Sequence, residues 1–256
     1  MRPRITKAKS SGSFFGGDFV GCFNDCAKSV SYTHLDVYKR QVDDALNNPG
    51  STNSERYIPS LNRWIKDANV PVQLFSGTAG NNGNETGPAL LLPSGKALFF
   101  GATSNTAIYT PSGNTNAGTW AAGPNMPNGL GVYDGPAAML PNGKILCVGG
   151  SPIDFFTNAA GTLVNGSFFE YDPVGNSFTG MTSPNMLTNG PTFVWPGNGK
   201  TYTNYFATYH LVLLALPDGT VLCSRDNTNQ LYVYQPDTGP LASSRPTILS
   251  LSLIHI

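Results

Sequence analysis

A Pro-x-Gly turn between two apolar runs occurs three times in this sequence and strongly constrains its fold. The three copies are Leu92-Pro93-Ser94-Gly95, Leu140-Pro141-Asn142-Gly143 and Leu216-Pro217-Asp218-Gly219. Proline sets φ at the first turn position, Asn and Asp tolerate unusual backbone conformations, and glycine accepts positive φ. Each copy therefore predicts a tight β-hairpin between two strands, with structural glycines at Gly95, Gly143 and Gly219.

The strand that follows each turn is apolar on both faces. Residues 97–100 read Ala-Leu-Phe-Phe, and residues 145–148 read Ile-Leu-Cys-Val. A half-exposed strand alternates apolar and polar residues, whereas a strand covered on both faces need not. These strands are therefore predicted to lie in sheets with neighbours stacked on both sides.

A second motif, Tyr-x-Pro, follows each hairpin and also occurs once before the first. It begins at Tyr57, Tyr109, Tyr171 and Tyr234. Trp64 stands seven residues after Tyr57, Trp120 eleven after Tyr109, and Phe178 seven after Tyr171. The pattern predicts a third strand, a turn and a fourth strand that carries an aromatic side chain.

Four-stranded units that repeat at this spacing predict the blades of a β-propeller. Successive tyrosines are 52, 62 and 63 residues apart, and the motifs resemble kelch-type propellers, whose repeat is about 50 residues. The resemblance is to the galactose-oxidase-like group and covers roughly residues 42–250. We therefore expect an all-β fold: a kelch-type β-propeller fragment of about three to four four-stranded blades over residues 42–242. Such a fragment forms an incomplete ring, so its terminal blades have bare faces that a neighbour should cover.

The two ends of the chain differ from this repeat. Residues 29–41 and 251–256 resemble translated sequencing-adapter sequence, as found in metagenomic assemblies. We expect residues 1–41 to be a foreign or disordered segment that lies apart from the blades, and the natural chain to continue beyond both ends. The resemblance to the galactose-oxidase-like group also implies that residues 243–256 hold the start of a truncated C-terminal β-sandwich domain and an artefact tail. The alternative is an ordinary N-terminal arm and C-terminal strand.

Composition excludes several partners. The chain has 15 Lys+Arg and 15 Asp+Glu residues, so it lacks the positive charge of a nucleic-acid-binding protein. It has no apolar run long enough to span a bilayer, so membrane insertion is not expected. No signal peptide is readable after the basic start. We expect an extracellular or cell-surface protein whose natural N-terminus has been lost.

The pair Tyr209-His210 is the sharpest candidate for chemistry, because it lies at the start of a predicted inner strand. The resemblance to galactose oxidase implies that such a pair ligates copper, and imidazole and phenolate suit Cu(II). That family's site also needs a second histidine and a tyrosine linked to cysteine, but His34 and His255 lie in the suspect ends. Tyr209 and His210 are therefore candidate metal ligands, or else rim residues that cap a strand. No catalytic residue is assigned.

Cys147 and Cys223 occupy the same position of the repeat, six residues after the hairpin proline. Equivalent positions in different blades should lie farther apart than the Cα separation of about 7 Å that a disulfide allows. We expect both to be small core hydrophobes, and neither suits the cysteine that the copper enzymes link to tyrosine.

Long connections are predicted over residues 151–166 and 180–207, at the end of the sheets opposite the hairpins. The second contains Trp195, Tyr202, Tyr205 and Phe206. Long loops on a rigid scaffold often carry function, and aromatic side chains there can stack on sugars or pack on a protein. We expect a non-catalytic scaffold, without cofactor, that binds a carbohydrate or protein ligand on the long-loop face. The alternatives are a fragment of a copper-radical oxidase acting on sugars or primary alcohols, and a structural cell-surface module.

Overall fold

The computed structural model describes residues 4–7, 52–75, 86–150, 166–183, 187, 193–194, 201–202, 208–225, 229–237 and 239. Within these residues the fold is all-β, and helical structure is limited to short 3-10 turns. Among the same residues, no helix has the length and apolar character that crossing a membrane requires.

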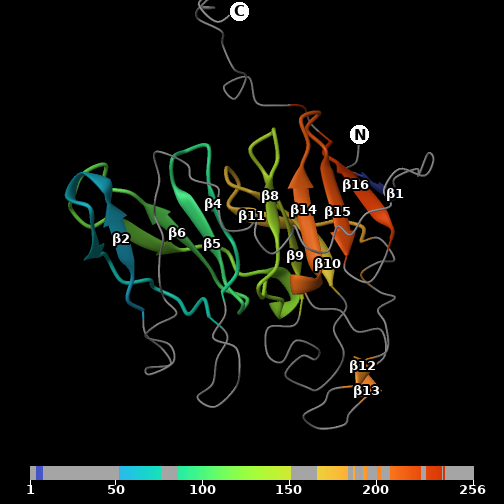
Figure 1. Ribbon diagram of the computed structural model, residues 1–256, viewed down its shortest axis with the longest axis horizontal. Helices are drawn as coiled ribbons and strands as arrows, with labels where there is room; N and C mark the ends of the chain where they lie inside the picture. The colour runs from blue at the N-terminus through green and yellow to red at the C-terminus, as the bar shows by residue number, and fades with distance from the viewer. Residues whose placement is uncertain are drawn as a thin grey trace, which may run out of the picture.

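The strands form a two-stranded pair followed by three four-stranded antiparallel sheets (Figure 1). The pair is β2 (Glu55–Ile58) and β3 (Arg63–Lys66). The β4–β7 sheet contains β4 (Ala89–Leu91), β5 (Ala97–Phe100), β6 (Thr106–Thr110) and β7 (Thr119–Ala122). The β8–β11 sheet contains β8 (Ala137–Met139), β9 (Ile145–Gly149), β10 (Ser167–Asp172) and β11 (Ser177–Gly180).

The last sheet, called the β14–β16 sheet below, draws its strands from both ends of the chain. It contains β14 (Leu211–Ala215), β15 (Val221–Arg225), β16 (Leu231–Gln235) and β1 (Arg4–Lys7) in the order β1-β16-β15-β14. Two short strands, β12 (Phe193–Val194) and β13 (Thr201–Tyr202), pair with each other apart from these sheets.

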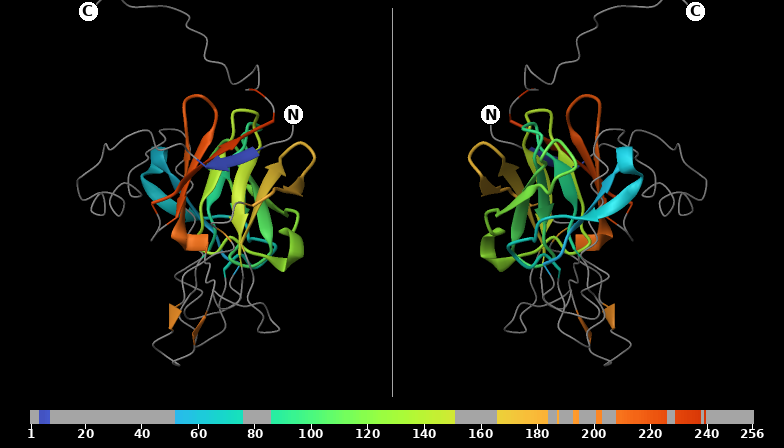
Figure 2. Two further views of the ribbon diagram at one scale, coloured as in Figure 1. Left: turned by 90° about the vertical axis from the view of Figure 1, so that its right-hand side faces the viewer. Right: turned by 90° about the vertical axis from the view of Figure 1, so that its left-hand side faces the viewer.

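Strand β1 differs from the expectation that residues 1–41 lie apart from the repeat. It runs antiparallel to β16 and places Ile5 opposite Tyr234 (Figures 1 and 2). This pairing satisfies backbone groups along an edge of β16 that would otherwise be open. The other residues predicted to be foreign, including 29–41, lie outside the described residues, as do residues 243–256.

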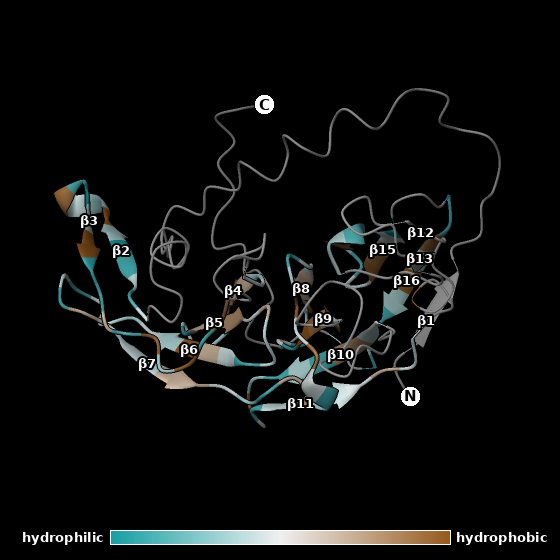
Figure 3. Cartoon of the chain, turned by 90° about the horizontal axis from the view of Figure 1, so that it is seen from below, coloured by the Kyte–Doolittle hydropathy of each residue, from teal (hydrophilic) through white to brown (hydrophobic). Residues whose placement is uncertain are grey.

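The sheets follow one another along an open arc (Figure 3). Strands β4 and β8 lie on the inner side of the arc, and β7 and β11 lie on its outer side. The first strand of each sheet contacts that of the next, because β8 touches both β4 and β14. Several four-stranded antiparallel sheets are therefore confirmed, and the described strands do not close a ring.

The three predicted hairpins are confirmed, and they share one geometry. The N–H of Gly95 donates to the Leu92 carbonyl at 2.9 Å, and Gly143 and Gly219 make the equivalent bond at the same distance. Each glycine has positive φ, at 78°, 81° and 85°. This is a type I turn followed by a left-handed residue, a common three-residue connection between antiparallel strands.

The predicted fourth strand with an aromatic residue is also confirmed. Tyr57 lies directly opposite Trp64, Tyr109 opposite Trp120, and Tyr171 opposite Phe178. The ring centroids of these pairs are 5.6, 5.1 and 5.2 Å apart. Cross-strand aromatic pairs of this kind stabilise the register of neighbouring strands.

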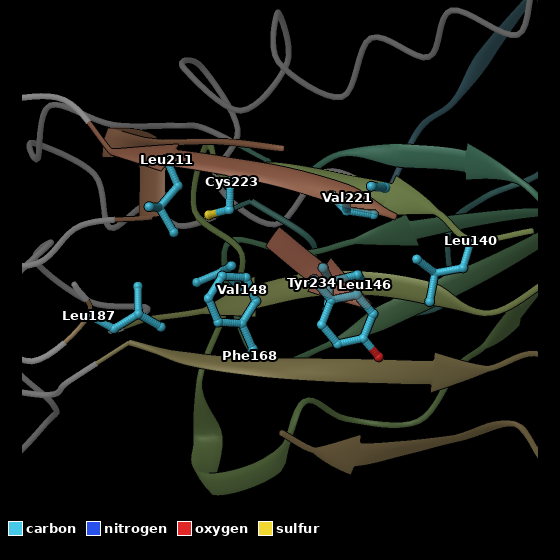
Figure 4. Packing of buried hydrophobic residues seen from close by; sticks show 10 residues of the cluster. Leu140, Leu146, Val148, Phe168, Leu187, Leu211, Val221, Cys223 and Tyr234 are labelled. Carbon is cyan, nitrogen blue, oxygen red and sulfur yellow. The ribbon is translucent and has the colours of Figure 1, made fainter. Parts of the chain in front are cut away.

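The middle sheet buries both of its faces, as its unbroken apolar runs predict. Ile145, Cys147, Phe169 and Tyr171 pack with Leu98 and Phe100 of the β4–β7 sheet. Leu146, Val148 and Phe168 point the other way and pack with Leu211, Val221, Cys223 and Tyr234 of the β14–β16 sheet (Figure 4). Residues next to each other in a strand point to opposite faces, so a single strand contributes to both cores.

Two buried tyrosines join neighbouring sheets through carboxylates. Tyr109 donates to Asp67, which follows β3, at 2.5 Å, and Tyr234 donates to Glu170 of β10 at 2.6 Å. Each carboxylate also has a basic partner: Arg56 lies 3.4 Å from Asp67, and Lys144 lies 3.2 Å from Glu170. Tyr171 differs, because its hydroxyl donates to Asn176 in its own hairpin at 2.9 Å. Hydrogen bonds to a charged acceptor are stronger than neutral ones.

We predict that Gly95→Ala destabilises the protein by about 1 kcal/mol, the cost of a left-handed backbone for a residue with a Cβ. No heavy atom lies within 4 Å of a Cβ at this position, so steric contact does not contribute. Gly239→Ala is the matched control, because that site is also open but lacks positive φ. Chemical denaturation of both variants measures the difference, and equal stability would contradict the turn assignment.

We predict that Tyr234→Phe costs about 1–3 kcal/mol, because it removes a buried hydrogen bond to a carboxylate. Tyr171→Phe should cost less, since its acceptor is a neutral amide. Burial and the bond to Glu170 raise the pKa of Tyr234 above its ordinary value of 10.0. The hydroxyl's contribution is therefore fully present below pH 10 and lost as the pH rises further. Denaturation from pH 7 to 11 should give a difference in unfolding free energy between wild type and Tyr234→Phe that is constant up to about pH 10 and smaller above it. A difference that widens above pH 10 would contradict this assignment.

Candidate functional site

Tyr209 and His210 lie in a 3-10 turn, Thr208–His210, directly before β14. Strand β14 leads from this turn to the hairpin at Gly219, so the pair lies at the end of the sheets opposite the hairpins. The two rings are in contact, with centroids 4.3 Å apart and planes inclined by 37°. Tyr209 is 40% exposed and His210 is half-buried. The turn therefore presents an aromatic surface at its predicted place.

The turn is anchored by the connection between β7 and β8. Thr208 is buried, and its hydroxyl donates to the carbonyl of Tyr133. Gly135 permits this approach, because a Cβ there would lie 2.7 Å from the Cβ of Thr208. No motif in the sequence marks these three supporting residues. Gly131 and Gly135, on either side of Tyr133, were the one feature of the sequence that could have indicated a close backbone approach here.

Arg225 is a further polar residue at this end of the β14–β16 sheet. It ends β15, lies opposite Leu211 in the strand register, and is buried. No sequence motif marks Arg225, because it is a single arginine within a strand.

The donors at the turn do not make up a copper site by themselves. Among the described residues, no group of three or more His, Cys, Asp or Glu side chains lies close enough together to hold a metal ion. Tyr209 and His210 supply two donors, whereas the Cu(II) sites of proteins combine more nitrogen, oxygen or sulfur ligands. The described residues therefore do not fit a complete copper centre, and no chemical step follows from them.

Cys147 and Cys223 are free thiols inside the sheets. Both are buried and neither forms a disulfide, so the expectation that they are core hydrophobes is confirmed. Burial raises the pKa of Cys223 to about 12 and that of Cys147 further. Reactive cysteines have a lowered pKa and are accessible, so these two have a packing role.

A small cavity of about 160 Å³ lies between the β2–β3 pair and the β4–β7 sheet. Its walls are mainly apolar and include Val70, Leu74, Phe99 and Trp120. Ser54 is also part of the lining, and it accepts a hydrogen bond from the Trp120 indole at 3.3 Å. Among the described residues that line the cavity, none has an acidic, basic or thiol side chain.

Most of the long connections predicted to carry function lie outside the described residues. This applies to residues 151–165 and to Trp195, Tyr205 and Phe206, while the structure describes Tyr202 only as a backbone position in β13. The candidate metal ligands Tyr209 and His210 follow the second of these connections, and their surroundings are described.

No family model and no curated protein matches this sequence. Among solved structures, the chain is similar to a fungal alcohol oxidase of the AA5 family in complex with copper. The TM-score is 0.42 and the sequence identity 18%, over 78% of this chain and 52% of that one. The chain thus spans about half the length of that structure.

Proposed function

We propose that this chain is part of a kelch-type β-propeller and serves as a non-catalytic scaffold that binds a carbohydrate at the end opposite the hairpins. The observation that carries the proposal is the difference between the two ends of the sheets. At one end, three-residue turns join β4 to β5, β8 to β9 and β14 to β15, and the β6–β7 and β10–β11 connections also turn back within their sheets. At the other end lie the connection from β7 to β8 and the exposed Tyr209. Rigid scaffolds commonly bind ligands through such loops.

The Tyr209–His210 turn suits a sugar ligand. Tyr209 is an exposed aromatic ring with a hydroxyl at its edge, stacked on the half-buried His210, and aromatic residues combine apolar area with polar groups in this way. The Thr208–Tyr133 hydrogen bond holds the turn in place, which lowers the entropy cost of binding. The chain has no net charge, which suits a neutral ligand. The resemblance of the sequence motifs to the galactose-oxidase-like group leads us to propose an extracellular or cell-surface location.

We predict that Tyr209→Ala weakens carbohydrate binding at least about tenfold, equivalent to about 1.4 kcal/mol, because it removes the stacking ring. Tyr209→Phe keeps the ring and should retain most of the affinity. Calorimetric titration with galactose and with neutral β-linked oligosaccharides is the measurement. Trp64→Ala is the control, since Trp64 is an exposed aromatic on the outer strand β3. Binding that is absent in the wild type, or equal in Tyr209→Ala, would refute the proposal and leave a protein ligand as the next candidate.

A fragment of a copper-radical oxidase acting on sugars or primary alcohols is the second candidate. It is favoured by the presence of two Cu(II) ligand types, phenol and imidazole, with touching rings on one turn. Tyr209 and His210 would be two of the ligands, and copper would supply the redox chemistry when bound. The remaining ligands would have to come from outside the described residues.

We predict that this chain takes up copper weakly, that His210→Ala does not change the uptake, and that no hydrogen peroxide forms with galactose and Cu(II). The reason is that two donors leave most of the coordination sphere to water, without the hydrogen bonds that orient ligands in a built site. Calorimetric titration with CuSO₄ measures the uptake, and His255→Ala is the control histidine variant. Stoichiometric binding that His210→Ala abolishes and His255→Ala preserves would put the oxidase ahead of the scaffold.

A further inference from the structure

The fourth strand of the β14–β16 sheet comes from a distant part of the chain. Strands β7 and β11 directly follow β6 and β10 and complete their own sheets. In the β14–β16 sheet the equivalent place, beside β16, is taken by β1, which is separated from β16 in the chain by all the other strands (Figure 1). The backbone ladder, rather than a short turn, therefore holds β1 on β16.

Strand β1 lies in the register of a repeat strand, but it lacks the aromatic residue of the repeat. Strand β1 reads Arg-Ile-Thr-Lys, and β3 reads Arg-Trp-Ile-Lys. In both strands the second residue stands opposite the Tyr-x-Pro tyrosine, as Ile5 does opposite Tyr234 and Trp64 opposite Tyr57. Trp120 and Phe178 hold this position in β7 and β11. Ile5 is therefore the exception among the equivalent positions.

The aromatic residue of β7 or β11 also reaches the preceding part of the arc. The indole of Trp120 donates to Ser54, which precedes β2, at 3.3 Å. The ring of Phe178 has its centroid 6.1 Å from that of Phe100 in the β4–β7 sheet. Isoleucine has no ring with which to make such contacts. Strand β1 thus fills the backbone position of a fourth strand without supplying the side chain that the repeat places there.

We propose that the edge of β16 away from β15 binds an extended peptide segment of a partner protein, with an aromatic residue opposite Tyr234, and that β1 occupies this edge as a replaceable strand. Peptides add to sheet edges in this way: main-chain hydrogen bonds give affinity, and alternate side chains give specificity. The β1–β16 ladder shows that the edge accepts an antiparallel strand from elsewhere in the chain. The equivalent strands β3, β7 and β11 indicate which side chain suits it. This inference is independent of the proposed carbohydrate binding.

The probe is a synthetic peptide with the β3 sequence Arg-Trp-Ile-Lys, blocked at both ends and labelled with a fluorophore. Fluorescence anisotropy with the full chain, up to millimolar concentration, measures its affinity. The matched control is Arg-Ala-Ile-Lys with the same label. The tryptophan peptide should bind about threefold more tightly or better, since a cross-strand aromatic pair contributes on that scale. Equal affinity of the two peptides would overturn the proposal.

Two substitutions at Ile5 change the competition between β1 and the peptide in opposite directions. Ile5→Pro weakens β1, because proline cannot donate to a strand ladder, so this variant should bind the peptide more tightly than wild type. Ile5→Trp gives β1 the aromatic residue of the repeat and should bind the peptide more weakly. Val174→Trp is the control, because it adds the same ring at a residue that is 94% exposed in the β10–β11 turn, and it should bind like wild type. Equal affinity of wild type and both Ile5 variants would overturn the proposal.

Hydrogen exchange locates the bound peptide. In Ile5→Pro the amides of β16 should exchange faster than in wild type, and the peptide should slow them again while those of β14 stay unchanged. Slowing at β7, β11 or β14 instead would place the peptide at another edge and overturn the proposal. If circular dichroism shows Ile5→Pro unfolded, Ile5→Trp against wild type still decides, since unweakened binding overturns it. A wild type that sediments as a dimer, with Ile5→Pro a monomer, would make β1 of a second copy the occupant and overturn the proposed partner.

Discussion

The packing of one sheet face on the next is the interaction on which the rest of this structure depends. Each central strand is apolar on both faces, so Leu146 serves one core while its neighbour Cys147 serves the other. Burying one such side chain contributes about 1.5–3 kcal/mol, and no single sheet could bury both faces alone. The sheets therefore stabilise one another in series, as repeat proteins do. On the β14–β16 sheet, Val212 and Leu214 are exposed.

Polar groups give this apolar stack its specificity. Tyr109 and Tyr234 each reach a carboxylate of the preceding sheet, and Arg56 and Lys144 lie beside those carboxylates. Because hydrogen bonds are directional and a buried carboxylate requires hydrogen bonds or a basic partner, the tyrosine bonds favour one placement of each sheet on the next. Apolar contacts alone would allow the sheets to slide, because they are non-directional.

The hairpin end and the long-loop end have different physical roles. Tight turns with left-handed glycines hold the paired strands in register. The opposite end carries the Thr208–His210 turn, which the β7–β8 connection supports through Tyr133. A ligand site at this end would be positioned by β14, whose Leu211 is buried against the β8–β11 sheet. Residues Gly135 and Thr208 are packing residues whose effect on Tyr209 is positional.

The sequence by itself determined the local elements of this protein. Proline and glycine at fixed places in Leu140–Gly143 admit few backbone conformations, so the hairpins could be read from residue types, and so could the strand carrying Phe178 opposite Tyr171. The tertiary structure alone decided which distant groups meet. The bond of Tyr234 to Glu170, the support of Thr208 by Tyr133, and the pairing of β1 with β16 join residues far apart in the chain. Such contacts depend on the relative placement of whole sheets, which local turn chemistry and alternating hydrophobicity do not specify.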